Sequence, residues 1–319
     1  MLKRTYGFDL DHKMKIHILL NAGGMGDILH AIPAVKVMAK HYPWQHYYIW
    51  VPDYLTPLFK KALPGMKVGP FSKAPKTTDG KKEGIISFNV GRHSSMRVHL
   101  TDFAFYMIMD RLPANNDERN FTTLNPKVNI KRFKLPENYV VISPYFRVTL
   151  RQITNGDLNI ISDYLEKEGI TPVLLGSAKQ VYNSATNTNT NGVRAWKAPE
   201  NAIDLCEKTS ILEALQVIWG AKAVVTMDGG LMHLACLSKT PIVAGFTSVD
   251  PKTRVPYKYG QLTDQIKIIE PDVDCRYCQS TWCMSYKGQH EFDSCYYEDH
   301  QCVKDMKGSK FVAKLKEII

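Results

Sequence analysis

Two glycine-broken turns carry the residue types best suited to chemistry. Residues 21–27 read NAGGMGD, and residues 228–233 read DGGLMH. Each turn follows an apolar run that predicts a buried strand and precedes apolar residues at helical spacing. Backbone N–H groups are free at a helix N-terminus, and glycine lets a ligand approach them closely, so the second turn suits a phosphate group. His233 would add a hydrogen-bond donor to the same anion.

The elements around these turns alternate between strand and helix in both halves of the chain. We expect strands at 15–20, 46–51, 84–89, 139–143, 171–175, 223–226 and 241–246. We expect helices at 28–41, 54–62, 100–111, 157–167, 210–220, 231–237 and 310–319. This alternation is typical of parallel sheets that bind ligands outside the carboxyl ends of their strands. The predicted fold is therefore α/β, with two Rossmann-like domains facing a central cleft.

The length of the chain suits two domains of ordinary size. It has 319 residues, of which 44% are hydrophobic and 23% charged, as in a folded protein. Residues 113–136 have no clear periodic element and are taken as the interdomain connection. The predicted division is an N-terminal domain at 1–135, a second domain at 136–270, and a Cys-rich tail with a terminal helix at 271–319.

The charge of the chain limits its partners and its sequence suggests a compartment. A formal net charge of +10 predicts an anionic partner, for which a nucleotide diphosphate, an anionic lipid head group and DNA all qualify. The N-terminal stretch has no long apolar run, and no run approaches the roughly 18 residues that span a bilayer. We expect a cytoplasmic protein without a transmembrane segment, with peripheral binding at the inner membrane face as an option.

A cluster of cysteines near the C-terminus predicts a metal site or free thiols. The spacing of the cluster allows a tetrahedral structural zinc site, whose ligands would be Cys275, Cys278, Cys283 and Cys295. Alternative ligands are Cys302, His290 and His300. Free thiols are the competing interpretation, and disulfides are disfavoured in a reducing compartment. Such a metal would hold the tail together and would not take part in catalysis.

Two segments together resemble the lipopolysaccharide heptosyltransferases, glycosyltransferase family 9. Residues 24–34 (GMGDILHAIPA) are similar to the Gly-Asp-x-x-His-x-x-Pro-Ala segment of that family. Residues 208–210 and 228–235, followed by Pro241 and the Pro-Tyr at 256–257, resemble its second conserved region, where Gly229 replaces a Thr or Ser. Residues 92–138 have no recognisable counterpart. The resemblance implies a GT-B fold, with a sugar-nucleotide donor on the C-terminal domain and the acceptor on the N-terminal domain.

The same resemblance implies a mechanism. Sugar transfer would invert the anomeric carbon and require no cofactor or divalent metal. Asp27 matches the catalytic carboxylate, which takes the proton of the acceptor hydroxyl. The competing interpretation of Asp27 is an N-cap for the helix that follows, which is a common role for Asp, and the two roles are compatible.

The donor and acceptor residues are assigned by matching positions. Asp228, Gly229, Gly230 and His233 match the donor-phosphate segment. Arg151 occupies the place of a Lys that contacts the donor diphosphate, with Arg147 as the rival and Ile153 where the family has Trp. The remaining donor candidates are Ser143, Ser177, Lys208 and Glu213, although a capping box of Ser210 with Glu213 explains the last equally well. The acceptor candidates are Gly24, Met25, His30, Arg92 and His93.

Three functions remain open on the sequence alone. The first is a hexosyl-, heptosyl- or pentosyltransferase that acts on a bacterial surface saccharide. The second is the same chemistry on a hydroxymethylated base in DNA, as in phage enzymes. The third is a non-catalytic, zinc-stabilised nucleic-acid-binding protein. A basic chain suits all three, because anionic glycolipids and DNA both favour a positive surface.

Overall fold

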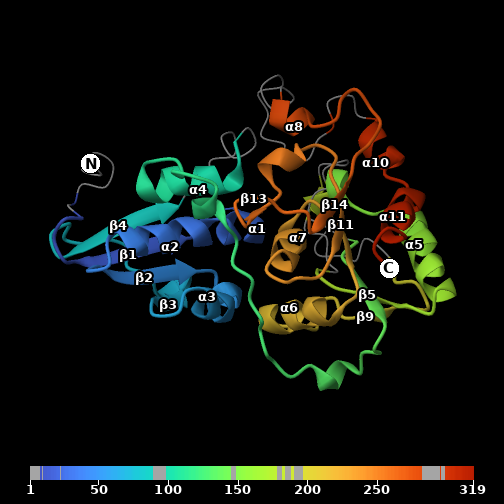
Figure 1. Ribbon diagram of the computed structural model, residues 1–319, viewed down its shortest axis with the longest axis horizontal. Coiled ribbons are helices and arrows are strands. Elements are labelled where there is room, and N and C mark those ends of the chain that lie inside the picture. The colour runs from blue at the N-terminus through green and yellow to red at the C-terminus, as the bar shows by residue number, and fades with distance from the viewer. Residues whose placement is uncertain are drawn as a thin grey trace. The chain divides into compact units, whose positions relative to one another are not determined.

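The computed structural model divides the chain into two compact units (Figure 1). It describes residues 8, 10–21, 23–88, 98–144, 149–177, 182–183, 188–189, 197–281, 295 and 299–319. Unit 1 comprises Met1–Pro126 and Pro256–Thr263, and unit 2 comprises Lys127–Val255 and Asp264–Ile319. The chain thus passes from one unit to the other within the predicted connection at 113–136, and residues 271–319 are part of unit 2.

Unit 1 is built on a parallel sheet of four strands in the order β3-β2-β1-β4. The strands are β1 (Lys15–Leu20), β2 (His46–Val51), β3 (Lys67–Pro70) and β4 (Glu83–Phe88). The helices are α1 (Met25–Leu29), α2 (Ala31–His41), α3 (Thr56–Ala62) and α4 (Leu100–Met109). Ile16, Ile18 and Leu20 are fully buried, which is what an alternating strand with one face on a core requires. Helices α2 and α4 pack together (Figure 1).

Two features of unit 1 differ from the predicted elements. The helix expected at 28–41 is broken at His30 into α1 and α2, and Pro33 lies in the first turn of α2, where a missing N–H costs little. Strand β3 was not predicted, because Gly69 and Pro70 in a four-residue segment give no strand signal. Its position at the edge of the sheet is where proline is tolerated.

Unit 2 contains a parallel sheet of six strands in the order β14-β11-β10-β5-β6-β9. The strands are β5 (Tyr139–Ile142), β6 (Thr171–Leu174), β9 (Ile203–Asp204), β10 (Val224–Met227), β11 (Ile242–Gly245) and β14 (Ile266–Ile269). The helices are α5 (Asn155–Lys167), α6 (Ile211–Gly220), α7 (Gly230–Ala235), α8 (Cys278–Thr281), α10 (Gln301–Asp305) and α11 (Gly308–Leu315). The central strands are buried on both faces, as parallel strands covered by helices must be.

The C-terminal helix α11 closes the core of unit 2. It packs on α5 (Figure 1), and both Phe311 and Leu315 are fully buried in the cluster that includes Ile142, Leu158 and Val243. Burying these two side chains stabilises the unit by about 2 kcal/mol each. An amphipathic helix is therefore confirmed in this region, and it spans Gly308–Leu315 where 310–319 was predicted. None of the helices in the described ranges is long and apolar enough to cross a bilayer.

A short hairpin returns to unit 1 from the second half of the chain. It consists of β12 (Tyr257–Lys258) and β13 (Gln261–Leu262), joined by Tyr259 and Gly260 at φ values of 52° and 77°. Positive φ at both central residues is the geometry of a tight hairpin turn, which glycine adopts easily. Phe121 N donates to Tyr257 O at 2.7 Å, and Gly260 N donates to Asn120 Oδ1 at 2.9 Å. These bonds explain why residues 256–263 belong to unit 1.

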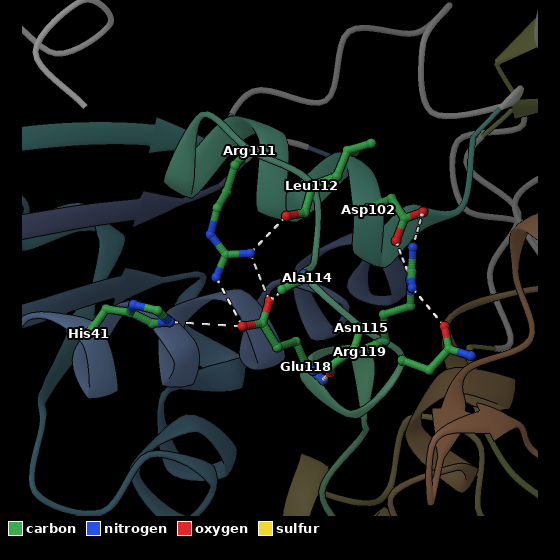
Figure 2. Close-up of polar contacts among 9 residues, drawn as sticks. His41, Asp102, Arg111, Leu112, Ala114, Asn115, Glu118 and Arg119 are labelled. Atoms are coloured by element: carbon green, nitrogen blue, oxygen red, sulfur yellow. Dashed lines mark hydrogen bonds and ion pairs between the residues drawn. The ribbon is translucent and has the colours of Figure 1, made fainter. Parts of the chain in front are cut away.

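Two arginine–carboxylate pairs hold the segment after α4 in place (Figure 2). The guanidinium of Arg119 binds Asp102 with both Nε, at 2.6 Å, and Nη2, at 3.0 Å. Arg111 binds both carboxylate oxygens of Glu118 at 2.7 and 3.1 Å. The hydrogen bond from Arg111 lowers the pKa of Glu118, and burial opposes this shift. Bidentate pairs of this kind are stronger than ordinary surface ion pairs.

The Glu118 pair predicts a pH-dependent contribution to stability. A carboxylate whose pKa is lower in the folded state contributes stability above its unfolded pKa and loses it as the pH falls through its folded pKa. Glu118→Gln should therefore lower the free energy of unfolding by about 1–2 kcal/mol near neutral pH. The difference should shrink as the pH falls through the folded pKa of Glu118, which lies below the ordinary value for a glutamate. Urea unfolding followed by tryptophan fluorescence measures the free energy of unfolding at each pH.

The control is Glu137→Gln, because Glu137 is exposed and has no ion pair among the described residues. A Glu118→Gln variant that loses nothing relative to this control at neutral pH would contradict the pairing.

Candidate functional site

The second glycine-broken turn places a buried carboxylate at the carboxyl edge of the unit 2 sheet. Asp228 directly follows β10, its N–H donates to Gly245 O at 2.8 Å, and it is only 2% exposed. The Asp228 Oδ2 atom lies 3.2 Å from Arg151 Nη1. On its other side Asp228 Oδ1 lies 3.9 Å from His233 Nε2, on the short helix α7. A buried carboxylate needs such partners, because an isolated charge inside a protein is very costly.

Arg151 is held in a defined position by its own turn. It is the last residue of the 3-10 turn η5 (Thr149–Arg151), and its side chain is 16% exposed. Leu150 O accepts a hydrogen bond from Thr247 Oγ1 at 2.5 Å, which ties this turn to the end of β11. The Nη2 group donates to Gln279 Oε1 at 3.1 Å. Nε of Arg151 is buried and has no hydrogen-bond partner in the described part of the chain.

Three of the predicted donor residues lie at the ends of neighbouring strands. Ser143 follows β5, Ser177 lies beyond β6, and Asp228 follows β10, and these strands are adjacent in the sheet. Ser143 is buried, whereas Ser177 is exposed and its hydroxyl donates to Glu207 Oε1 at 3.4 Å. Parallel strands bring their carboxyl ends to one edge, which is where such sheets bind ligands. Arg147, the rival of Arg151, lies outside the described residues.

The start of α6 shows the capping arrangement. Ser210 N donates to Glu213 Oε2 at 2.9 Å, and Glu213 N donates to Ser210 Oγ at 3.4 Å. Arg132 Nη2 donates to both carboxylate oxygens of Glu213, at 2.9 and 3.0 Å. The hydrogen bond from the Ser210 backbone is the largest of the effects that lower the pKa of Glu213. Lys208 is exposed, and its ammonium donates to Asp204 O at 2.7 Å. The donor contacts predicted for Lys208 and Glu213 remain predictions.

The first glycine-broken turn, in unit 1, fixes the carboxylate of Asp27. Asp27 lies in α1, and its Oδ2 atom accepts a hydrogen bond from Gly24 N at 2.7 Å. The N-cap of α1 is Gly24 and not Asp27, and the half-buried Asp27 carboxylate caps the helix from its third position by accepting the hydrogen bond of Gly24 N. The base role of Asp27 remains a prediction. Gly23 has φ +92°, and a Cβ atom added to it would lie 2.6 Å from Asp27 Oδ2. Gly24 is exposed and Met25 half-buried at the same turn.

His30 is buried within unit 1. The side chain is 0% exposed, and its Nδ1 atom forms a hydrogen bond with Thr101 Oγ1 of 2.7 Å. Its ring packs edge-on against Phe121, with centroids 4.7 Å apart. These contacts give the ring a packing role beside α4, and the acceptor contact predicted for His30 remains a prediction. Arg92 and His93, the other acceptor candidates in this half, lie outside the described residues.

The cysteine cluster is only partly described. Cys283 lies outside the described ranges, as does His290, and the described cysteines form no disulfide with one another. Burial raises the pKa of Cys302 to about 12, and the neighbouring thiols of Cys295 and Cys275 add to this shift. Among the described residues no group of three metal-ligating side chains is close enough to hold an ion. The predicted zinc site therefore remains a prediction.

More than half of the chain matches a known protein family. Residues 108–285 match the model of glycosyltransferase family 9 (heptosyltransferase), which covers more than half of the chain. The chain belongs to glycosyltransferase family 9. The match spans the Arg151 turn, the capping box of α6 and the Asp228 turn of this family 9 chain.

Curated relatives are similar over part of their length. Lipooligosaccharide heptosyltransferase 2 of Haemophilus influenzae is 29% identical over 109 residues, which are 34% of this chain and 29% of the relative. The enzyme of the same name from Campylobacter jejuni is 26% identical over 116 residues, 36% of this chain and 31% of the relative. The matched region therefore spans less than a third of either relative.

Solved structures are similar over almost the whole chain. TibC, described as an iron-containing dodecameric heptosyltransferase, in complex with ADP-D-β-D-heptose, has a TM-score of 0.70 at 14% identity, over 96% of this chain and 77% of that one. ADP-heptose LPS heptosyltransferase II of E. coli has a TM-score of 0.64 at 16% identity, over 96% and 98%. These likenesses confirm the predicted GT-B class, built from two Rossmann-like domains.

One residue of the site, Gln279, carries no signal in the sequence. Gln279 lies in α8, far along the chain from Arg151, and contacts its guanidinium. It stands inside the Cys-rich tail, where no motif or periodicity marks it. Only the folding of the tail against the loop after β11 brings Gln279 to the site, so no local signal would have found it.

The turn before α1 yields a prediction about Gly23. Gly23→Ala would strain a backbone at positive φ and place a methyl group against the Asp27 carboxylate. Gly65, also in unit 1, has φ +87°, and a methyl group there would have nothing within 4 Å. Gly65→Ala should therefore cost only the backbone strain, about 1 kcal/mol, whereas Gly23→Ala should cost about 2–3 kcal/mol. Urea unfolding measures both, and equal losses would contradict the close contact at Gly23.

Proposed function

We propose that this family 9 chain is an inverting glycosyltransferase that moves a sugar from a nucleotide-sugar donor to an acceptor hydroxyl without a catalytic metal. One observation carries the proposal. The guanidinium of Arg151 lies at the carboxyl edge of the unit 2 sheet beside Asp228 and His233, within the region that matches the family. An arginine fork suits a diphosphate because it donates two parallel hydrogen bonds to its oxygens.

The reaction requires the protein to stabilise the leaving group and to accept a proton from the acceptor hydroxyl. When the bond between the anomeric carbon and the diphosphate breaks, the leaving nucleoside diphosphate keeps the electron pair and gains negative charge. Arg151 stabilises that charge in place of a metal ion, since a preorganised cation in a partly buried site is effective. The oxygen of the acceptor attacks the anomeric carbon from the opposite face, and Asp27 takes the hydroxyl proton as the new bond forms.

The donor and acceptor are proposed from the relatives. TibC was solved with ADP-D-β-D-heptose, and the curated relatives are named lipooligosaccharide heptosyltransferases. We infer a donor of the ADP-heptose type and an anionic saccharide acceptor of the lipopolysaccharide type, which the net charge of +10 would attract. Neither a contact among the described residues nor a comparison favours DNA as the acceptor. We place the reaction in a reducing cytoplasm, with which the thiols of the described cysteines are compatible.

A structural metal in the tail is a separate proposal. TibC is named as iron-containing. In this chain burial raises the pKa of Cys275 and of Cys302, and the nearby thiol of Cys295 adds to both shifts, so a cation bound among these groups would relieve the repulsion between thiolates. The proposed ligands are Cys275, Cys278, Cys283 and Cys295, with Cys302 as an alternative. The metal would be zinc or iron, both of which accept four thiolates.

The base assignment predicts the behaviour of one variant. Asp27→Asn keeps a side-chain oxygen for the cap of α1 but removes the proton acceptor. It should bind ADP-heptose as the parent does and lose sugar transfer by a factor of about 100 or more. Transfer is measured with ADP-heptose and a heptose-deficient lipopolysaccharide acceptor, and binding by calorimetry. Turnover within a few-fold of the parent would remove Asp27 from the base role.

The diphosphate contact predicts a second result. A bound donor raises the melting temperature by mass action, so a panel of nucleotide sugars should include one that stabilises the protein. Arg151→Ala should reduce the shift caused by ADP-heptose. Arg111→Ala, the same change at a residue bound to Glu118 in unit 1, should leave it unchanged. Equal shifts in Arg151→Ala and the parent would show that Arg151 does not bind the donor.

A further inference from the structure

The Cys-rich tail of unit 2 runs beside the loop that follows β11. Tyr277 N donates to Thr247 O, and Gln279 N donates to Ser248 O, each at 2.9 Å. Asp250 N donates to Ser280 Oγ at 3.0 Å. Three successive bonds between the two segments fix the tail in register with the loop. The tail is thereby fastened to the element that also binds the Arg151 turn through Thr247.

From this position the side chain of Gln279 reaches the guanidinium of Arg151. Gln279 is 4% exposed, and its Oε1 atom accepts two hydrogen bonds, from Ser248 Oγ at 3.0 Å and from Arg151 Nη2 at 3.1 Å. A carboxamide oxygen has two acceptor sites, so these bonds use its full capacity. Ser248 is itself buried, so the oxygen cannot move away without leaving a buried hydroxyl unpaired.

The bond from Gln279 determines which part of the guanidinium binds Asp228. The ion pair joins Nη1 to Asp228 Oδ2, while Nη2 is bound to Gln279. An arginine and a carboxylate left to themselves favour a bidentate pair that uses two N–H groups. Gln279 opposes that arrangement by holding Nη2. The guanidinium then keeps donors such as Nε, which has no hydrogen-bond partner among the described residues, for another anion.

We propose that Gln279 is a positioning residue. It prevents the Arg151 guanidinium from forming a bidentate pair with Asp228 and so leaves the guanidinium able to bind the donor diphosphate. This inference rests on the proposed function, because it takes the diphosphate as the ligand of Arg151. Gln279 acts through Arg151 and need not touch the donor. The tail therefore contributes to donor binding without being part of the catalytic machinery.

A double-mutant cycle tests this role with ADP as the probe and adenosine as a ligand without phosphate. Gln279→Ala should weaken ADP binding about tenfold, as expected when a hydrogen bond to a charged group is lost, and leave adenosine binding unchanged. In an Arg151→Ala background the same substitution should have no further effect, because its target is gone. Calorimetry measures the ligand affinities of the parent, the two single variants and the double variant. Gln279→Met, which keeps the length of the side chain, replaces the Ala variant if that variant does not fold.

The matched control is Gln265→Ala, which removes a carboxamide bound to carbonyl oxygens of residues 235, 238 and 240. It should cost stability and leave ADP affinity unchanged. If Gln279→Ala binds ADP like the parent while Arg151→Ala does not, the positioning role is wrong and the proposed function stands. An equal loss from Gln279→Ala with and without Arg151 also overturns it. If the parent fails to bind ADP and ADP-heptose, or Arg151→Ala binds them as well as the parent, the proposed donor site itself fails.

Discussion

The site in unit 2 depends on the burial of one carboxylate. Asp228 is almost inaccessible to solvent, and an unpaired charge there would cost several kcal/mol of stability. Arg151 supplies the opposite charge, and the surrounding loops hold Arg151 where it does so. The ends of β5, β10 and β11, the 3-10 turn η5 and the tail all contribute to this one arrangement. A cation that a fold must keep in place for its own stability is also a cation that is already positioned for an anionic ligand.

The arrangement explains why the tail belongs to unit 2. Residues 277–280 bind the loop after β11, and α11 fills the core beside α5. Both contacts would be lost if the tail were a separate appendage, and Phe311 and Leu315 would be exposed to water. The site and the core thus depend on the same C-terminal segment, which links donor binding to the stability of the unit.

The sequence was sufficient for the elements with strong periodicity and insufficient for short ones. Strand 15–20 and helix 211–220 were predictable because apolar residues recur at the period of the element. Strand 139–142 was predictable because it is a short continuous apolar run, as in a strand buried on both faces. Strand β9 has two residues and β3 contains Gly and Pro, so neither carries a pattern. The hairpin at 257–262 could be placed in unit 1 only from bonds to Asn120 and Phe121, which are far away in the sequence.

The residues of the site likewise divide into those that the sequence could predict and those that it could not. Asp27 and Asp228 stand in glycine-rich turns that a resemblance to family 9 can locate. Residue type indicates a capping role for Asp27 but not its position three residues after the N-cap Gly24. His30 matches the family segment equally well, yet its side chain is buried. The motif could not show this, because it records residue identity and not the direction of a side chain. Gln279 has no motif, since its role arises from a contact between segments more than a hundred residues apart.

The most direct measurement is a crystal structure of the protein with ADP bound. We expect a guanidinium nitrogen of Arg151 within about 2.7–3.2 Å of a diphosphate oxygen, with Gln279 Oε1 still bound to Nη2. ADP bound elsewhere, or bound beside an Arg151 that is paired only with Asp228, would contradict it.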